Sequence, residues 1–425
     1  MIKALKEYKL VGLNTVYLSI MEIIHLAMPF VALPYIIKTV GADNYGKVVF
    51  SQTIASYFSI TVNFGLDIIA AKDVAINRDN TLVLGKILGK VLTIKSIICA
   101  SVFIIYTILI FSWSKTQNNI ILYYSSFLIC LTEIFFLGWL FQGLEKMFAI
   151  TLIKTSSLVI YVILLYTIIK KEDQYCYIPA LQSGALVLTS IIGCLYAIQK
   201  ERIIPSFPQI KDIFGYFKKS IPFYFSRASG VINNSIATTV IGINLGDYQV
   251  ATYDLAQKIA RGSLTPVYMT TQATYPHNAR HKNWGFARNV FLILGGTVLL
   301  GCITLFFAAP MVIKIVGDDK LPEAVPVLRV LIIYIMLGTC SVYLGTPTLV
   351  AWGYSKPFNN SVVLSTILII GLYGILYILK TNTIFSYCFV LIITECFIVV
   401  YRLFYCLKYK IINETFLHKK GTQNE

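Results

Sequence analysis

Long apolar runs separated by short polar turns occupy almost the whole chain. An α-helix needs about 20 apolar residues to cross a membrane, and twelve runs reach that length. They lie at about 12–37, 46–70, 90–111, 119–142, 150–169, 177–198, 220–244, 248–275, 290–315, 324–350, 359–379 and 384–407. The pattern predicts an all-α polytopic membrane protein with twelve transmembrane helices, of which the eighth is the most polar.

The composition supports a membrane protein and excludes two other classes. Hydrophobic residues make up 57% of the 425 residues and charged residues only 13%, against about 25% charged in a soluble domain. An ordinary soluble enzyme and a disordered chain are therefore excluded. The net charge of +16 is assigned to basic cytoplasmic loops, and no nucleic-acid partner is expected. The first apolar run is too long for a cleaved signal peptide, so it is expected to remain as a span.

The Lys and Arg residues of the loops predict the orientation, because cytoplasmic loops carry the excess of basic residues. With the amino terminus inside, the cytoplasmic segments hold 23 Lys and Arg and the opposite segments hold eight. The last cytoplasmic segment is counted from Arg402 onward. Both termini are thus expected in the cytoplasm, which requires an even number of spans. The setting would be the inner membrane of a bacterium, with the chain as a multi-pass protein.

Short similar turns recur between the two halves of the chain. The turns 143–146 and 353–356 both read G-x-x-K, and the turns 41–43 and 245–247 both join a Gly to an Asp. These matches favour two six-helix lobes related as a parallel pseudo-repeat. The predicted domains are an N-lobe at 1–199, a cytoplasmic linker at 200–219, a C-lobe at 220–410 and a cytoplasmic tail at 411–425.

Ionisable residues inside the predicted spans are the main functional signal. Each one costs about 2.5–3.5 kcal/mol at a helix centre, so it is expected to face a cavity or a partner. Asp254, Lys258 and Arg261 stand at i, i+4 and i+7, which places them on one helical face with Tyr268 further along it. Two cations and one anion leave a net positive stripe that suits an anionic substrate. The alternative is an Asp254–Lys258 pair that only stabilises the helix.

The first span combines polar residues with prolines. Glu22 and His25 stand at i, i+3 and could carry a proton, because histidine titrates near neutrality. Pro29 and Pro34 remove backbone donors and predict a kink that a gate could use. The alternative is a structural Glu22–His25 hydrogen bond between packed helices.

Further candidates lie in other spans. Glu133 and Glu395 are lone carboxylates whose partner could be Arg329 or Arg261, whereas Asp67, Lys95 and Arg227 lie near cytoplasmic helix ends and could reach the interface. The predicted substrate-binding residues are Lys258, Arg261, Arg329, Arg227, Asn233 and Tyr268, and the predicted ion-coupling residues are Asp254, Glu22, His25 and Glu133.

Several chemistries have no sequence signature. There is no Walker A motif, no HExxH or GxSxG motif and no Cys/His cluster with zinc spacing. We therefore expect no catalytic residues, no bound metal and no cofactor other than a coupling H⁺ or Na⁺. Most of the nine cysteines lie in apolar runs and are expected to act as small packing residues.

Several local motifs resemble bacterial polysaccharide flippases of the Wzx type, which belong to the multidrug/oligosaccharidyl-lipid/polysaccharide superfamily. The matching segments lie at 14–46, 57–65, 141–146, 253–259 and 272–276, and include Pro34-Tyr35-Ile36, Asn63-Phe64-Gly65 and Ala256-Gln257-Lys258-Ile259. The resemblance implies two lobes around a central cationic cavity. It also implies transport of an undecaprenyl-diphosphate-linked oligosaccharide, of O-antigen or capsule type, to the periplasmic leaflet by alternating access. Partners would be the lipid-linked oligosaccharide, membrane lipid, a glycan polymerase and chain-length proteins.

Two other functions are weighed against a flippase. A cation-coupled multidrug exporter of the same superfamily would want an acidic cavity, which the cationic stripe in the eighth span disfavours. A membrane polymerase or ligase would need a large extracytoplasmic loop, and the loops predicted on that side are all short. Related lipid II flippases usually have fourteen spans and several Arg in the first two helices. Those helices here hold Glu22, His25 and Asp67 instead.

Overall fold

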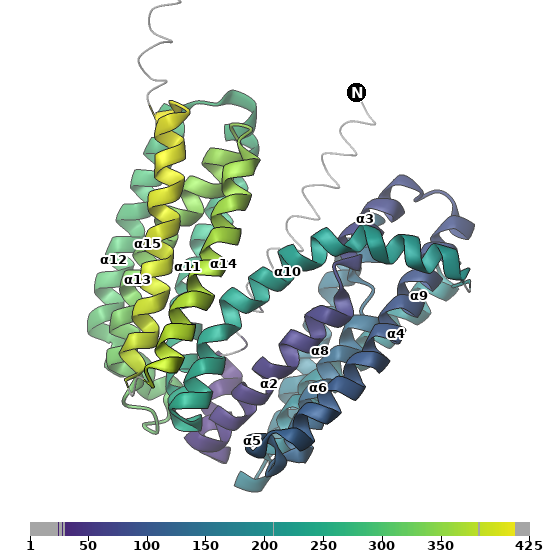
Figure 1. Ribbon diagram of the computed structural model, residues 1–425, viewed down its shortest axis with the longest axis horizontal. Helices are drawn as coiled ribbons and strands as arrows, with labels where there is room; N and C mark the ends of the chain where they lie inside the picture. Colours follow the sequence, from purple (N-terminus) through teal and green to yellow (C-terminus); the bar gives the residue numbers. More distant parts are fainter. Residues whose placement is uncertain (1–23, 25–27, 29, 207, 381–382, 413–425) are drawn as a thin grey trace, which may run out of the picture. The chain divides into compact units, whose positions relative to one another are not determined.

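The computed structural model describes residues 24, 28, 30–206, 208–380 and 383–412, and every statement below concerns these residues (Figure 1). All regular structure in them is helical. Nine helical stretches are long and apolar enough to cross a membrane. Three predicted spans fall outside those nine: the first, of which an apolar helix at Phe30–Val40 is described, and the seventh and eighth, which are more polar. The protein is thus an all-α, multi-pass membrane protein.

The chain divides into two compact units, Met1–Ile232 and Asn233–Glu425. From residue 42 onward, the helices of unit 1 are α2 (Ala42–Asn63), α3 (Leu66–Ile76), α4 (Thr81–Ser112), α6 (Ile120–Phe135), α8 (Met147–Ile168) and α9 (Ile178–Gln199), together with the short α5 (Ser114–Gln117), α7 (Gly138–Gly143) and η1 (Glu172–Tyr177). Helix α10 (Ile210–Asn244) continues into unit 2. There it is followed by α11 (Asp247–His281), α12 (Trp284–Gly317), α13 (Ala324–Leu344), the π-helical turn η2 (Gly345–Val350), α14 (Ser355–Ile378) and α15 (Ile384–Lys408).

The same packing pattern occurs within each unit. In unit 1, α6 packs against α2, α4 and α9, and α8 packs against α9. In unit 2, α13 packs against α11, α12 and α15, and α14 packs against α15. Helices in the same order along each half therefore make the same contacts, as a duplicated six-helix unit would.

Backbone hydrogen bonds repeat the pattern in atomic detail. The N–H groups of Lys146 and Tyr354 each donate to the carbonyl five residues earlier, at 2.8 Å in both cases. The preceding residues have positive φ, +60° at Glu145 and +96° at Gly353. This is the helix-ending arrangement in which a left-handed residue turns the chain back on its last carbonyls. The two turns thus share one conformation, 208 residues apart. The G-x-x-K match paired Gly143 with Gly353, an offset of 210, whereas the structure pairs Glu145 with Gly353, so the sequence match was two residues out of register.

The predicted spans 46–70 and 119–142 are each interrupted in the structure. The first breaks between α2 and α3, where Phe64 has φ +49° and Gly65 has φ +69°. A Cβ on Gly65 would lie 2.7 Å from the backbone nitrogen of Tyr224, so only glycine allows α10 to approach there. The second breaks at residues 136–137, between α6 and α7. Continuous hydropathy gave no sign of either break.

The first part of the predicted linker is fixed against α4. Residues 200–206 and 208–209 are not helical, and the Ser206 N–H donates to the Gly85 carbonyl at 3.2 Å. A Cβ on Gly89 would lie 1.9 Å from the Ser206 carbonyl oxygen, so the contact needs a glycine at that position. Ile203 is buried in the core of unit 1. The segment before α10 is therefore part of unit 1.

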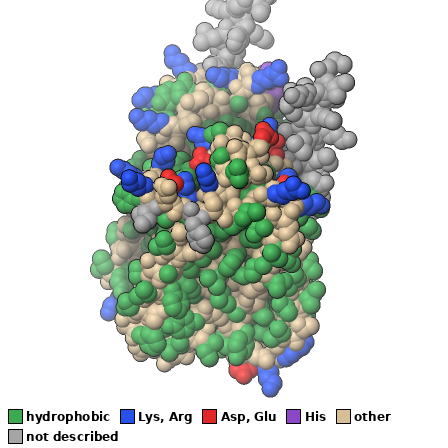
Figure 2. Space-filling model, turned by 90° about the vertical axis from the view of Figure 1, so that its right-hand side faces the viewer, with side chains coloured by type: hydrophobic (Ala, Val, Ile, Leu, Met, Phe, Trp, Pro, Cys, Tyr) green, Lys and Arg blue, Asp and Glu red, His purple; other side chains and the backbone are tan. Residues whose placement is uncertain are grey.

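The molecular surface matches a lipid environment. On the face drawn in Figure 2, hydrophobic side chains cover the lower part, and Lys and Arg side chains gather in a band above it. Exposed apolar residues recur along the membrane-length helices, for example Ile104, Ile108 and Ile163. In water this surface would be unfavourable, whereas lipid tails solvate it.

Candidate functional site

The predicted stripe on the eighth span lies in the middle of α11. Lys258 Nζ donates to Asp254 Oδ2 at 2.7 Å, and Asp254 is buried. This is the intrahelical pair that the sequence offered as an alternative to function. Arg261 is outside the pair, and its Nη2 donates to the Asn234 carbonyl of α10 at 3.2 Å. The pair and Arg261 together leave one positive charge in the middle of α11.

Arg329 and Arg227 are the other two arginines among the predicted substrate-binding residues. Arg329, near the start of α13, donates from Nε to the Phe306 carbonyl at 3.3 Å and stacks its guanidinium over the Phe306 ring. Arg227 is an exposed residue of α10 in unit 1. Arg329 forms no hydrogen bond or ion pair with Lys258 or Arg261 among the described residues. The role of both arginines in substrate binding stays a prediction.

Asn233 and Tyr268 are the two uncharged residues among the predicted substrate-binding residues, and both lie in unit 2. Asn233, in α10, has a buried side-chain oxygen without a hydrogen-bond partner among the described atoms. Tyr268 follows Arg261 by two turns on α11 and is 46% exposed. It lines the same cavity as Arg402 of α15.

Most of the predicted gate and proton residues of the first span lie outside the described residues. These are Glu22, His25 and Pro29. Pro34 is described, within the helix Phe30–Val40. The next residue, Tyr35, donates its hydroxyl to the Ile169 carbonyl at 2.7 Å and stacks on Tyr166.

A buried polar network occupies the centre of unit 1. Lys95, on α4, is fully buried and donates to Asp67 Oδ1 at 2.6 Å. The Asn63 amide donates to Asp67 Oδ2 at 2.8 Å and to Glu133 Oε2 at 2.7 Å. Ser59 donates to Glu133 Oε1 at 2.9 Å. The network therefore joins two carboxylates to one lysine across α2, α3, α4 and α6.

This network corrects two sequence-based expectations. Lys95 and Asp67 were expected to reach the membrane interface, but the helix break at Gly65 lets Asp67 turn inward to meet Lys95. For Glu133 the sequence left Arg329 or Arg261 open as partners, whereas its carboxylate accepts hydrogen bonds from Asn63 and Ser59. The spacing could not show this, because the contacts join four helices that are far apart in sequence.

A buried arginine organises the polar contacts of unit 2. Arg402, on α15, is 6% exposed and donates from Nε to Ser361 Oγ at 3.0 Å and from Nη1 to the Ser341 carbonyl at 2.6 Å. Glu395, on the same face of α15, accepts a hydrogen bond from Ser341 Oγ. Counting Arg402 as a cytoplasmic tail residue was wrong. Its seven-residue spacing from Glu395 was the available signal, since that spacing puts both on one helical face.

Lys95 and Arg402 bind equivalent carbonyls in the two units. Lys95 Nζ donates to the Glu133 carbonyl at 2.7 Å, and Arg402 Nη1 donates to the Ser341 carbonyl at 2.6 Å. Those carbonyls are 208 residues apart and each precedes the irregular turn that ends α6 or α13. A carbonyl next to an interrupted helix needs a donor when no water is present. Both buried cations therefore have a structural role.

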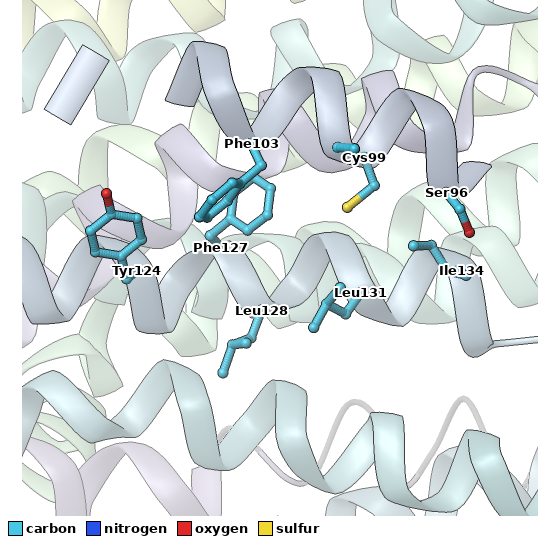
Figure 3. Close-up of a pocket in the computed structure, with 9 residues that line it drawn as sticks. Ser96, Cys99, Phe103, Tyr124, Phe127, Leu128, Leu131 and Ile134 are labelled. Atoms are coloured by element: carbon cyan, nitrogen blue, oxygen red, sulfur yellow. The ribbon is translucent and has the colours of Figure 1, made fainter. Parts of the chain in front are cut away.

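Unit 1 also contains an apolar cavity of about 480 Å³ between α4 and α6 (Figure 3). The side chains drawn there are almost all hydrophobic, with Phe103 and Phe127 beside each other and Tyr124 at one end. It offers no charged group to a headgroup and suits an acyl or isoprenoid chain by polarity alone.

One family model matches more than half of the chain. The model of the family described as "Polysaccharide biosynthesis protein" matches residues 11–282. Two curated proteins with the name "Putative O-antigen transporter" are similar to the chain. That of Escherichia coli K12 is 21% identical over 94% of this chain and 97% of its own length. That of Shigella dysenteriae is 24% identical over 71% of this chain and 76% of its own length.

Solved structures with the same fold are membrane transporters. The lipid II flippase MurJ in an inward closed conformation superposes with a TM-score of 0.71 over 95% of this chain and 90% of its own, at 15% identity. An inward-facing multidrug resistance MATE family transporter of the MOP superfamily gives a TM-score of 0.69 over 96% and 99%, at 15% identity. At these identities the likeness shows the fold alone. The family match carries further, and the chain belongs to the polysaccharide biosynthesis protein family.

Proposed function

We propose that the protein is a flippase that moves an undecaprenyl-diphosphate-linked oligosaccharide repeat unit, of O-antigen or capsule type, from the cytoplasmic to the periplasmic leaflet. It is a transporter and no enzyme. Three observations support this: the family match, the curated names of two relatives and the membrane-length helices. Lipid tails alone do not let a charged, sugar-bearing headgroup cross, so a protein must supply a polar path.

The observation that carries the proposal is the polarity of α11. This helix has 35 residues and holds Asp254, Lys258 and Arg261 near its middle. It packs in unit 2 against α13, which is apolar and of membrane length. Charged residues at membrane depth are stable only beside a partner or a wet path. One charge of the stripe remains beyond the intrahelical pair, and it suits an anionic substrate better than a cationic drug.

The proposed architecture has twelve spans in two six-helix lobes around a central cavity, with transport by alternating access. The repeated packing and the repeated turns support two equivalent lobes. Both termini would face the cytoplasm, in the inner membrane of a bacterium. In this setting the substrate comes from cytoplasmic glycan synthesis and passes to a glycan polymerase and chain-length proteins.

Ion coupling is proposed for the unit 1 network and for Asp254. The Asp67 carboxylate accepts a hydrogen bond from Lys95, and the Glu133 carboxylate is joined to Asp67 through the Asn63 amide. When all three are ionised, the network carries one negative charge in excess, which H⁺ or Na⁺ would neutralise. The Asn63 amide bridges both carboxylates while its own oxygen has no partner among the described atoms. Glu22 and His25 remain candidates on sequence grounds.

The test follows the lipid-linked glycan in cells deleted for the gene. Radiolabelled undecaprenyl-linked repeat units are extracted, and their leaflet is determined by accessibility to an enzyme added to the periplasmic side. Accumulation of single units facing the cytoplasm, with loss of surface polymer, is the expected result. Units that reach the periplasm but stay unpolymerised would place the protein after translocation. Unchanged glycan together with lost resistance to cationic dyes would favour a multidrug exporter.

A further inference from the structure

Unit 2 contains a cavity of about 370 Å³ whose lining combines apolar surface with polar groups and includes one charged residue. The lining comes from α11, α13, η2, α14 and α15, and consists of Tyr268, Thr271, Gln272, Val342, Thr346, Phe358 and Arg402. Arg402 is the charged member of that set. The hydroxyls of Tyr268 and Thr346 and the amide of Gln272 surround it with uncharged hydrogen-bonding groups. Such a lining can replace the water around one compact anion.

The guanidinium of Arg402 is held rigidly and keeps donors for a ligand. Nε donates to Ser361 Oγ and Nη1 to the Ser341 carbonyl, and the guanidinium carbon lies 4.7 Å from the centre of the Phe358 ring. No described residue accepts a hydrogen bond from Nη2. A planar guanidinium with fixed orientation is the side chain best suited to bind phosphoryl oxygens.

The backbone is shaped to admit this arginine. A Cβ on Gly345 would lie 2.6 Å from Arg402 Nη1 and 2.9 Å from Phe358 Cε2, so a larger residue would displace the guanidinium. Gly345 begins the π-helical turn η2, and short π-helical turns occur frequently at functional sites. The Asn278 amide fixes that turn by donating to the Pro347 carbonyl at 2.8 Å.

The charge of Arg402 is only partly compensated, in contrast to that of Lys95. Lys95 forms an ion pair with Asp67 at 2.6 Å. Arg402 forms no ion pair with a described carboxylate, although Glu395 interacts with it electrostatically. Glu395 is absent from the cavity lining and accepts its hydrogen bond from Ser341. The cavity therefore meets a cation that lacks a directly bound anion.

The position of the cavity along the helices suits loading of a headgroup. Arg402 lies near the carboxyl end of α15, Gln272 in the last third of α11, and Phe358 in the first turn of α14. Arg280 and His281 end α11 and Lys408 ends α15 on the same side. In the proposed orientation this is the cytoplasmic end. A basic rim there would raise the local concentration of an anionic headgroup.

We infer that the cavity around Arg402 is a binding site for a phosphoryl group. On the proposed function, on which this identification of the ligand rests, the group is the diphosphate of the lipid-linked saccharide as it enters from the cytoplasmic leaflet. Arg402 supplies the charge and its free Nη2 donors. Tyr268, Gln272 and Thr346 supply further hydrogen bonds.

The test measures binding of radiolabelled undecaprenyl diphosphate to the full-length protein in phosphatidylcholine nanodiscs. Undecaprenol is the phosphate-free probe, and phosphatidylglycerol is the competing phospholipid. Arg402→Gln should weaken binding about 10- to 100-fold, the range for a hydrogen-bonded charge. The affinity of Arg402→Lys should lie between that of Arg402→Gln and that of the wild type, because lysine keeps the charge but lacks the planar pair of N–H donors of the guanidinium. Arg288→Gln, an exposed arginine near the start of α12, removes the same charge elsewhere and should leave the affinity within about twofold.

Arg402 also donates hydrogen bonds to Ser341 and Ser361, so its replacement could weaken binding by destabilising unit 2. A second variant therefore tests the cavity without changing Arg402. Thr346→Val keeps the shape and removes a cavity hydroxyl that makes no hydrogen bond among the described residues, and should weaken binding about threefold to tenfold. Thermal melting checks that each variant is folded. The phosphoryl site would be overturned if Arg402→Lys and Thr346→Val both bound undecaprenyl diphosphate with wild-type affinity. It would also be overturned if the variants lost as much affinity for undecaprenol as for undecaprenyl diphosphate. Equal affinity for phosphatidylglycerol would overturn its assignment to the saccharide carrier.

The outcome is separable from that of the proposed function. If repeat units accumulate in the deletion strain but Arg402 variants bind normally, the phosphoryl site is wrong and the flippase stands. If binding depends on Arg402 but the deletion leaves glycan unchanged, the site stands and the flippase is wrong.

Discussion

Replacing Lys95 by Met should destabilise the protein strongly, because it leaves a carboxylate without its cation. Lys95 is fully buried, donates to Asp67 at 2.6 Å and also binds the Glu133 carbonyl at 2.7 Å. Removing one partner of a buried ion pair costs about 3–5 kcal/mol. The Asp67 side chain is 27% exposed, so water compensates part of the loss and the lower end is expected. At about 2–4 °C per kcal/mol, the melting temperature should fall by about 6–12 °C.

The assay is thermal unfolding of purified protein in detergent, followed through a double-mutant cycle. Asp67→Asn alone and the double variant Lys95→Met/Asp67→Asn complete the cycle. The double variant should regain at least about 1 kcal/mol relative to the sum of the single changes, because neither charge is then left alone. Strictly additive changes, or a single-variant shift below about 2 °C, would show that the pair does not hold unit 1 together.

Three other expectations follow from the contacts described above. Arg261→Ala should lower the amount of surface glycan at least about tenfold at a normal protein level, while Arg261→Lys should retain part of it. Gel analysis of surface polysaccharide measures both, and full activity of the alanine variant would show that Arg261 does not contact the substrate. Gly65→Ala should lower the free energy of unfolding by at least ~1 kcal/mol, because φ is +69° and the backbone of Tyr224 leaves no room for a Cβ. An unchanged melting temperature would contradict this. Gly89→Ala should detach residues 200–209 from α4 and speed their cleavage by trypsin, whereas Gly184→Ala, whose Cβ meets nothing within 4 Å, should not.

The fold was largely predictable because membrane insertion imposes a simple pattern. Each predicted run from 46–70 onward contains a helix of the structure, and nine stretches have the length and hydropathy of a span. The eighth run, accepted only on topology, forms the 35-residue helix α11. The breaks at Gly65 and at residues 136–137 were missed. They depend on single backbone conformations and close helix contacts, which average hydropathy does not record.

The candidate site was less predictable than the fold. The i, i+4, i+7 spacing correctly brought Asp254 and Lys258 into contact, because that contact lies within one helix. Arg402 was assigned to the tail, since it lies close to the end of an apolar run. The pairing of Asp67, Lys95 and Glu133 joins residues from separate helices, and no local spacing encodes it.

The sequence by itself determined the class of the protein, most of its helices and the family. These follow from local quantities: hydropathy over about 20 residues and short motifs of neighbouring residues. The tertiary structure alone decided which buried charges meet. A charge at membrane depth must find a partner, but which partner depends on how helices distant in sequence pack. That is why Lys95 joins Asp67 in unit 1, and why Arg402 faces a polar cavity in unit 2.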